Sequence, residues 1–338
     1  MNSRRDKRWS RREFLSTATL GGAGALLGLP SELFAAEPPP ETTKIRLAYH
    51  SNSLCHAPLY IAEDLLRGEG FTDVQYLKIA GVKKSLASGE VDVVTHFCGP
   101  LAIQVDEGDP IVILSGLHPG CVELVATERI RSIRDLKGKT IAVTDLRGGR
   151  HTFLAVVAAH VGLDPRKDFK VVIYRAVEAI RLLAEKKLDA FLAAPPDAQE
   201  LRAKRIGYVV VNSAVDRPWS QYFCCMVAGN REFVRKHPAA TKRALRAILK
   251  ATNICAVEPD RAARSLVKKK YATKYDYALQ LMNDLPYGKW REYDPEDTVR
   301  FYSLRLHEAG MIKSSPQKII DQGTDWRFLK ELKKELKT

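Results

Sequence analysis

The chain has 338 residues, of which 45% are hydrophobic, and this is enough for two α/β domains of about 100–150 residues each with their own cores. Such a composition excludes disorder for most of the chain. The formal net charge of +14 is spread along the sequence, with basic clusters only at 4–12, 268–270 and 329–337. Since no basic stripe is interleaved with aromatic residues, we expect no nucleic-acid binding.

The first 36 residues are typical of an export signal rather than of a folded domain. The sequence SRREFL at 10–15 matches the twin-arginine export signature, and an uncharged segment at 17–29 precedes small residues at 34–36. An apolar run of about 13 residues is too short to span a bilayer, which needs about 20. We therefore predict a signal peptide at 1–36 that the Tat export machinery reads, a leader at 37–43, and a mature protein in the periplasm.

Six cysteines stand at positions 55, 98, 121, 224, 225 and 255. Their spacing contains no C-x-x-C pair, so we expect each to be a small buried hydrophobic residue rather than part of a metal knuckle. A metal site built from Cys55, His56, Cys98 and His151 would need all four side chains to converge, and no spacing rule supports this. We predict neither a metal nor a cofactor.

Strand and helix patterns alternate over the first two thirds of the chain. The expected strands lie at 45–50, 74–79, 91–96, 111–117, 121–127, 140–145, 171–176, 189–194 and 208–213. The expected helices between them lie at 58–66, 83–88, 100–108, 151–162, 178–187 and 197–204. This βα rhythm predicts parallel sheets with right-handed crossovers. From residue 230 onward the pattern becomes helical, with no sheet of its own.

The later helices are therefore expected to return and cover the first domain. This makes one lobe discontinuous, at 44–126 plus 225–338, with a second lobe at 127–224. The chain would cross between the lobes near Thr127 and Cys224.

Three stretches carry a resemblance to a known family. They are L-x-S-G-E-x-D at 86–92, S-I-x-D-L-K-G-K-x-I-A-V at 132–143, and the Gly-Gly loop at 148–149. In these the chain resembles periplasmic solute-binding proteins of ABC transporters of the nitrate/sulfonate/taurine type, and also binding proteins for the pyrimidine precursor of thiamine. The resemblance implies the type II periplasmic binding fold, with two α/β lobes of parallel or mixed sheets joined by two hinge crossings. It also implies permease subunits as partners, a monomer, and a protein that is not an enzyme.

Ligands of open α/β sheets bind outside the carboxyl ends of strands, where loops lead into helix N-termini with free N–H groups. Four expected loops lie there, at 51–58, 97–100, 145–151 and 194–197, and two aromatic residues lie where the chain recrosses. The candidate ligand contacts are Ser51, Ser53, Cys55, His56, Cys98, Gly99, Pro100, Gly148, Gly149, Arg150, His151, Pro196, Trp219 and Tyr222.

Each group of candidates has an ordinary structural alternative. Gly148 and Gly149 would let the backbone approach an anion at a helix N-terminus, or would form a plain turn with Arg150 in solvent. Asp197 is expected to cap the helix at 197–204 rather than to contact a ligand. Trp219 and Tyr222 would stack on a ligand ring or pack between lobes.

The adjacent Cys55 and His56 also suggest a thiol nucleophile. One enzyme with this fold, a desulfinase of aromatic sulfinates, uses a cysteine from its first strand-to-helix loop. Adjacent residues on an extended segment point in opposite directions, however, so His56 is poorly placed to act as the base. The expected function is the substrate-binding subunit of an ABC importer for a small anionic or zwitterionic solute, such as a sulfonate, carboxylate or pyrimidine-like compound. A desulfinase-like hydrolase and a sensor-type binding protein are the alternatives.

Overall fold

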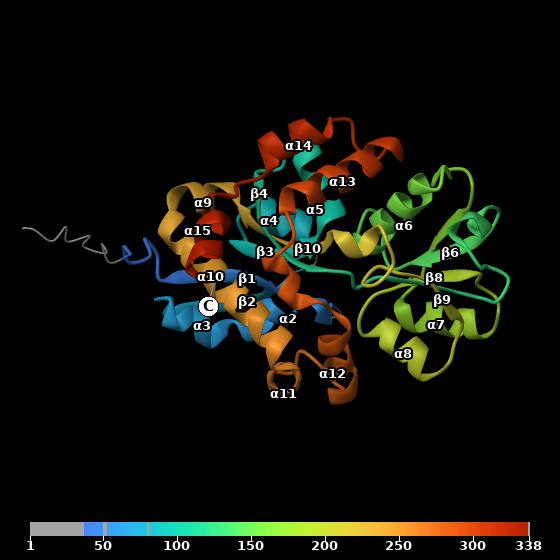
Figure 1. Ribbon diagram of the computed structural model, residues 1–338, viewed down its shortest axis with the longest axis horizontal. Helices are drawn as coiled ribbons and strands as arrows, with labels where there is room; N and C mark the ends of the chain where they lie inside the picture. Colours follow the sequence, from blue (N-terminus) through green and yellow to red (C-terminus); the bar gives the residue numbers. More distant parts are fainter. Residues whose placement is uncertain (1–36, 50–52, 80, 337–338) are drawn as a thin grey trace, which may run out of the picture. The chain divides into compact units, whose positions relative to one another are not determined.

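The computed structural model describes residues 37–49, 53–79 and 81–336, and these residues build two five-stranded sheets (Figure 1). The first sheet has the strand order β2-β1-β3-β10-β4, and the second has the order β7-β6-β8-β5-β9. We call the first sheet with its helices lobe I and the second sheet with its helices lobe II. The signal peptide predicted at 1–36 and the predicted contact Ser51 lie outside the described residues.

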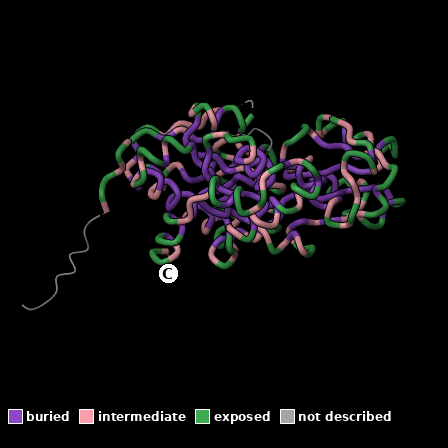
Figure 2. The backbone as a smooth tube through the Cα atoms, turned by 90° about the horizontal axis from the view of Figure 1, so that it is seen from above, coloured by how far each residue is buried: buried purple, intermediate pink, exposed green. Residues whose placement is uncertain are grey.

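The strands of both sheets are short. Those of lobe I are β1 (Lys44–Tyr49), β2 (Asp73–Lys78), β3 (Val93–Phe97), β4 (Ile111–Pro119) and β10 (Phe223–Asn230). Those of lobe II are β5 (Glu123–Ala126), β6 (Thr140–Val143), β7 (Lys170–Ile173), β8 (Ala190–Ala193) and β9 (Tyr208–Asn212). The central strands are buried along their whole length, and Figure 2 shows this buried backbone as continuous purple segments.

The helices follow the strands in chain order. They are α2 (Ala57–Ile61), α3 (Glu63–Gly68), α4 (Val82–Ala87), α5 (Cys98–Asp106), α6 (Gly149–His160), α7 (Ala176–Ala184), α8 (Asp197–Ala203), α9 (Arg231–Lys236), α10 (Pro238–Val257), α11 (Pro259–Lys268), α12 (Tyr275–Asp284), α13 (Pro295–Glu308), α14 (Pro316–Gly323) and α15 (Arg327–Glu335). Short 3-10 turns are η1 (Leu54–His56), η2 (Ile133–Leu136), η3 (Trp219–Gln221) and η4 (Tyr287–Arg291). Within the described residues, none of these helices combines the length and the hydropathy needed to cross a bilayer.

Both sheets are mixed rather than purely parallel. In lobe I, β1 pairs in parallel with β2 and β3, whereas β10 runs antiparallel to β3 and β4. In lobe II, β6 pairs in parallel with β7 and β8, whereas β5 runs antiparallel to β8 and β9. The antiparallel strands β5 and β10 are those that follow a passage from one lobe to the other. The βα rhythm predicts the parallel strands and a strand at β5, but neither the antiparallel direction of β5 nor the strand β10.

Helices cover both faces of the second sheet, because successive side chains of each strand point to opposite faces. Val125, Ala142 and Phe191 point to one face and form a cluster with Ile180 and Leu183 of α7 and with residues of α8. The next residue along each of these strands points to the other face, where α6 packs. In Figure 1 the helices α7 and α8 lie on one side of the green sheet and α6 on the opposite side.

The C-terminal helices return to lobe I, as the sequence predicts. Arg246 of α10 pairs with Glu69, which follows α3, with a buried Nη1–Oε2 distance of 2.6 Å. The segment before α15 touches β4, where the N–H of Asp325 donates to the carbonyl of Ile113 at 2.9 Å. Figure 1 shows these orange and red helices beside the blue and teal strands of lobe I.

The first passage between the lobes comes earlier than the sequence suggests. The expected strand at 121–127 was assigned to the first lobe with a crossing near Thr127, but β5 (Glu123–Ala126) belongs to the second sheet. The chain therefore crosses at 120–122 and returns at 213–222, directly before β10. An apolar strand pattern looks the same in either sheet, so sequence periodicity does not locate this boundary.

The two crossing segments lie against each other. Ser213 Oγ accepts hydrogen bonds from the N–H groups of Cys121 at 3.1 Å and Val122 at 2.9 Å, and donates to the carbonyl of Val122 at 2.8 Å. Gly120 has a φ of +68°, and a Cβ there would lie 2.3 Å from the Cα of Ala214. Only glycine allows this approach of the two backbones.

The motifs that carry the family resemblance have structural roles. Asp92, at the end of the first motif, is buried and accepts hydrogen bonds from the backbone and guanidinium of Arg46. Asp135 of the second motif closes a capping box with Ser132 at the start of η2. Gly138 follows in the left-handed region, with a φ of +75°. Asp92 thus joins the start of β3 to β1, and Asp135 and Gly138 fix the turn at η2. None of these residues carries information about a ligand.

A substitution at Gly116 of β4 tests how tightly lobe I is packed. A Cβ at this residue would lie 2.2 Å from the ring of Phe223, and both residues are buried. We expect Gly116→Ala to lower the free energy of unfolding by about 1–3 kcal/mol through overpacking. Urea denaturation measures this. Gly68→Ala is the control, because Gly68 is exposed and has no neighbouring atom within 4 Å; equal midpoints for the two variants would contradict the packing seen at β4.

Candidate functional site

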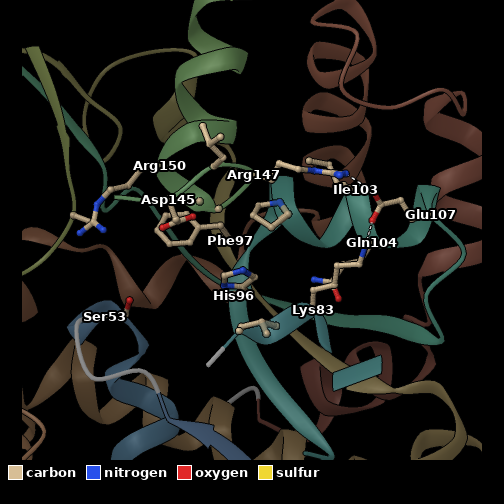
Figure 3. Close-up of a pocket in the computed structure, with 17 residues that line it drawn as sticks. Ser53, Lys83, His96, Phe97, Ile103, Gln104, Glu107, Asp145, Arg147 and Arg150 are labelled. Carbon is tan, nitrogen blue, oxygen red and sulfur yellow. Dashed lines mark hydrogen bonds and ion pairs between the residues drawn. The ribbon is translucent and has the colours of Figure 1, made fainter. Parts of the chain in front are cut away.

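A cavity of about 460 Å³ opens between loops of the two lobes (Figure 3). Its lobe I wall comes from Ser53 after β1, from the start of α4, from the end of β3 and from one face of α5. Its lobe II wall comes from the segment 145–150 between β6 and α6 and from Ala194 after β8. The cavity therefore lies at the carboxyl ends of β1, β3, β6 and β8, as expected for an α/β sheet.

The β6–α6 loop is a tight turn that exposes helix N–H groups. A Cβ at Gly148 would lie 1.5 Å from Oδ1 of Asp145, so this position accepts only glycine without rearrangement. The first intrahelical bond of α6 runs from the N–H of Thr152 to the carbonyl of Gly148 at 2.9 Å. The N–H groups of the preceding turn have no acceptor in the helix itself and favour an anion at this end of the cavity.

The N-terminal turns of α5 and α6 pack directly on each other. A Cβ at Gly149 would lie 2.2 Å from the ring of Phe97, and a Cβ at Gly99 would lie 2.8 Å from Oγ1 of Thr152. Gly99 belongs to lobe I and Gly149 to lobe II, so two glycines set how closely the lobes meet at this wall. Close contact between lobes, rather than contact with ligand, accounts for Gly99.

A charged group joins the lobes at the edge of the cavity. Glu107, next to the end of α5, accepts hydrogen bonds from Lys83 of α4 and from Arg147 of the β6–α6 loop. Burial raises the pKa of Glu107, but the hydrogen bonds and charges of Lys83 and Arg147 outweigh this and leave the pKa below its ordinary value. Both cations are more than half exposed, so each pair by itself contributes little to stability. Figure 3 shows these side chains facing one another across the cavity edge.

Arg150 lines the cavity but is held by its own lobe rather than lying in solvent. Its Nη1 donates to Thr144 Oγ1 at 2.6 Å and its Nη2 to Asp197 Oδ2 at 2.7 Å. Burial raises the pKa of Asp197, and the charge of Arg150 offsets part of that rise. Asp197 is thus the counter-ion of Arg150, whereas the sequence suggested a helix cap; α8 has no side-chain cap at this end.

The structure brings together only part of the predicted contact set. Those that line the cavity are Ser53, Pro100, Gly148, Gly149 and Arg150. His151 is half-buried directly beside the cavity, and its Nδ1 accepts a hydrogen bond from the N–H of Arg147 at 3.0 Å. Cys98, Gly99 and Pro196 lie on the correct loops without lining the cavity.

Four other predicted contacts lie away from the cavity. Cys55 and His56 are almost completely buried in η1 and point into the interior of lobe I, as does the carbonyl of Cys55, which accepts from Tyr287 Oη. Trp219 packs edge-to-face against Phe153 and Phe301. Tyr222 stacks on Phe301 with ring centroids 4.0 Å apart. The aromatic pair therefore contributes to packing at the second crossing, and Cys55 does not line the cavity.

Sequence reasoning missed most of the polar lining. Gln104 and Glu107 follow Pro100 at helical spacing on α5, and this polar face on an otherwise apolar helix was the available signal. Asp145 and Arg147 lie in the expected ligand loop 145–151 but were not singled out there, whereas Lys83 at the start of α4 lies outside the four expected loops and only the tertiary fold brings it to the cavity.

The four residues weighed and rejected as a metal site from the sequence, Cys55, His56, Cys98 and His151, do not form such a group among the described residues. Among the described residues, the one group of three side chains with ligand atoms close enough to hold a metal ion is Cys55, Cys121 and Cys225, whose sulfur atoms lie within 4.8 Å of one another. None of these cysteines lines the cavity.

Comparison with known protein families matches residues 38–269 to the model of the NMT1-like family, which is more than half of the chain. The chain belongs to the NMT1-like family. A search of curated proteins found no match.

Solved structures share the fold of this NMT1-like protein at low sequence identity. The periplasmic nitrate-binding protein NrtA from Synechocystis PCC 6803 has a TM-score of 0.72 at 17% identity, over 88% of this chain and 90% of that one. The periplasmic aliphatic sulphonate binding protein SsuA from Escherichia coli has a TM-score of 0.65 at 14% identity, over 82% and 96%. The alkanesulfonate-binding protein SsuA from Xanthomonas axonopodis pv. citri, bound to MOPS, gives 0.64 at 15%, over 83% and 96%. The predicted two-lobed periplasmic binding fold is confirmed.

Gly149→Ala tests the contact between the lobes in the NMT1-like protein. The new methyl group would enter the ring of Phe97 and force α5 and α6 apart, so we expect a loss of about 1–3 kcal/mol in the free energy of unfolding. Gly288→Ala is the matched control, because a Cβ there meets its nearest atom only at 4.0 Å. Adding Phe97→Leu to Gly149→Ala should recover part of the loss; no recovery in urea denaturation would contradict the clash.

The lowered pKa of His151 predicts that the free energy of unfolding depends on pH. Burial lowers the pKa of His151 from its ordinary value of 6.5; Asp145 raises it in part and Arg147 lowers it further. Below pH 6.5 the unfolded chain therefore binds more protons at this residue than the folded chain, and stability falls with falling pH in that range. We expect His151→Asn to remove this part of the slope between about pH 6.5 and 5, whereas the exposed control His307→Asn keeps it. An NMR titration that gives His151 a midpoint at or above 6.5 would contradict the assignment.

Proposed function

We propose that the protein is the substrate-binding subunit of an ABC importer and that it carries a small zwitterionic or anionic organic solute in the periplasm. The observation that carries this proposal is the cavity between the lobes, whose walls both come from loops at the carboxyl ends of strands. The fold shared with nitrate- and sulfonate-binding proteins of the periplasm supports it. The partners would be permease subunits that bind the closed form, and the protein would act as a monomer.

The anionic end of the solute would lie at the N-terminus of α6. The free N–H groups of that turn and the cations Lys83 and Arg147 supply the positive potential. A helix N-terminus contributes about 0.3–1 kcal/mol towards an anion, and up to about 2 when partly buried. Arg150 adds charge to the wall but is already paired with Asp197, so it would act mainly by fixing the loop.

The same cavity also offers acceptors, and these favour a zwitterion over a simple anion. Asp145 and Glu107 are carboxylates in its lining, and Gln104 is buried with an Oε1 that has no hydrogen-bond partner among the described residues. A buried acceptor without a partner costs free energy, which a donor on the solute would recover. An ammonium or amide group beside the anionic group would supply that donor.

Transport function would follow from closure rather than from bond chemistry. Arg147 of lobe II and Glu107 of lobe I form a pair across the cavity edge that strengthens as the lobes approach and is lost as they part. A solute that contacts both lobes stabilises the closed state by its differential affinity. A micromolar dissociation constant requires only about −8 kcal/mol, which a few charge-assisted bonds can provide.

A thermal-shift series on the full mature chain tests the solute class. Four matched probes are used: an aminosulfonate such as taurine, the amino acid β-alanine, ethanesulfonate without the ammonium group, and ethylamine without the anion. At 100 times its dissociation constant a bound probe stabilises the protein by about 2.7 kcal/mol. We expect the zwitterions to shift melting most and the amine not at all. A shift with the amine alone, or with none of the probes at millimolar concentration, would contradict the proposed class.

Arg147→Gln tests the proposed anion site with the best probe of that series. We expect at least a tenfold loss of affinity by calorimetry, because the substitution removes one charge-assisted bond of about 1.5–3 kcal/mol. Lys186→Gln is the control, since Lys186 is exposed and pairs with Glu128 outside the cavity. If both variants bind equally well, the solute does not contact Arg147.

A further inference from the structure

Four buried thiols meet beside the two crossing segments; we call this place, where the chain enters and leaves lobe II, the base of lobe II. The Sγ atoms of Cys121 and Cys224 are 3.2 Å apart, which is closer than unbonded sulfur atoms normally lie. The Sγ atoms of Cys55 and Cys225 complete the group, within 4.8 Å of Cys121 and of each other. All four residues are at most 5% exposed. The spacing of the cysteines along the chain does not predict this cluster, because its members come from three distant segments.

The close pair stands where the chain enters and leaves lobe II. Cys121 lies in the first crossing, two residues before β5, and Cys224 is the second residue of β10, directly after the second crossing. The residues between them, 122–223, contain every strand of the second sheet. A bond between these two sulfur atoms would make lobe II a covalently closed loop, tied at the same place where Ser213 joins the two crossing segments.

A metal ion is a poor occupant of this cluster. Three thiolates around one divalent ion leave a net negative charge, and burying such a charge without a cation is costly. Burial, neighbouring thiols and His56 cause the pKa shifts of these four cysteines. No Lys or Arg side chain is among the causes, so no such cation compensates a negative charge here. A disulfide is neutral and suits a dry interior.

We propose that Cys121 and Cys224 are an oxidation site, at which a small peroxide converts the two thiols to a disulfide that closes lobe II at its base. A thiolate of the pair attacks one peroxide oxygen, the O–O bond breaks, and the departing hydroxide takes up a proton and leaves as water. The sulfur is left as a sulfenic acid. The second thiol attacks that sulfur, and its proton leaves with the hydroxyl group as a second water. Two sulfur atoms lose two electrons in total, and the peroxide gains them.

The surroundings of the pair suit this chemistry. Cys121 lines a second, small cavity of about 10 Å³ together with Glu123 and Gln199. Oε2 of Glu123 and Oε1 of Gln199 are buried and have no hydrogen-bond partner within the described part of the chain, so they can accept from a single water molecule, which is the most that a cavity of this volume holds. Burial raises the pKa of Cys224, but hydrogen bonds from Cys121 and Cys225 outweigh it and lower the pKa to about 7. Cys224 is therefore the thiol of the pair that loses its proton more readily, since the pKa of Cys121 is raised to about 11.

The test is direct identification of the bond by mass spectrometry. The reduced full chain is treated with hydrogen peroxide, free thiols are alkylated, and tryptic peptides are sequenced without reduction. Cys121 falls in the peptide 85–129 together with Cys98, and Cys224 falls in the peptide 206–231 together with Cys225. The double variant Cys98→Ala/Cys225→Ala leaves one cysteine in each peptide, so a link between these peptides can then join only Cys121 to Cys224.

We expect the wild type to lose two mass units on oxidation, the two peptides to be linked in both proteins, and the melting temperature to rise by several degrees because the bond closes a loop between residues 103 positions apart. Cys224→Ala should abolish the link and the rise in melting temperature. Cys255→Ala is the matched control, a buried cysteine outside the cluster, and should keep both.

Three results would overturn the proposal. One is six alkylated cysteines in the oxidised wild type after unfolding. Another is a link that joins Cys55 to Cys121 or Cys225 instead. The third is stoichiometric binding of zinc or cadmium that Cys55→Ala removes. Because the wild-type result is read by sequencing alone, it does not depend on whether a variant folds.

Discussion

The hydrogen bonds of one hydroxyl group, that of Ser213, hold together the two segments by which the chain passes between its sheets. The group accepts from two backbone N–H groups of the first crossing and donates to a carbonyl of the same segment. Backbone groups buried in a crossing have no ladder to join, and leaving them unpaired would be costly. With the crossings side by side, β5 and β10 each enter their sheet antiparallel, and the carboxyl ends of the parallel strands of both lobes face one cavity.

The cavity itself is shaped by glycines more than by its polar residues. Gly148 lets the β6–α6 loop fold over Asp145, Gly149 lets the ring of Phe97 rest on α6, and Gly99 accommodates Thr152. These contacts fix the distance between two helix N-termini, and the charged side chains are then added around them. Charges of both signs at the edge, with Glu107 between Lys83 and Arg147, make the site polar without giving it one dominant sign.

Much of the architecture could be predicted from sequence, because hydrophobic periodicity is a local property. The strands at 45–50, 91–96 and 140–145 and the helix after Gly149 appear within a few residues of their expected bounds. The site was predicted only in part. The glycine loop and Pro100 lie at the cavity, since strand-to-helix loops must gather at one edge of a sheet. The pair Cys55 and His56 occupies such a loop too, but η1 turns both side chains inward.

The sequence by itself determined the alternation of strands and helices, the loops that could meet a ligand, and the family to which the chain belongs. Each of these depends on residues close together along the chain or on the order of segments. Only the tertiary structure decided which sheet receives the strand after residue 120, which cations share Glu107, and that four thiols from three distant segments meet at the base of lobe II. These are contacts between residues up to 170 positions apart, as for Cys55 and Cys225, and their energies depend on burial and distance, which no local pattern records.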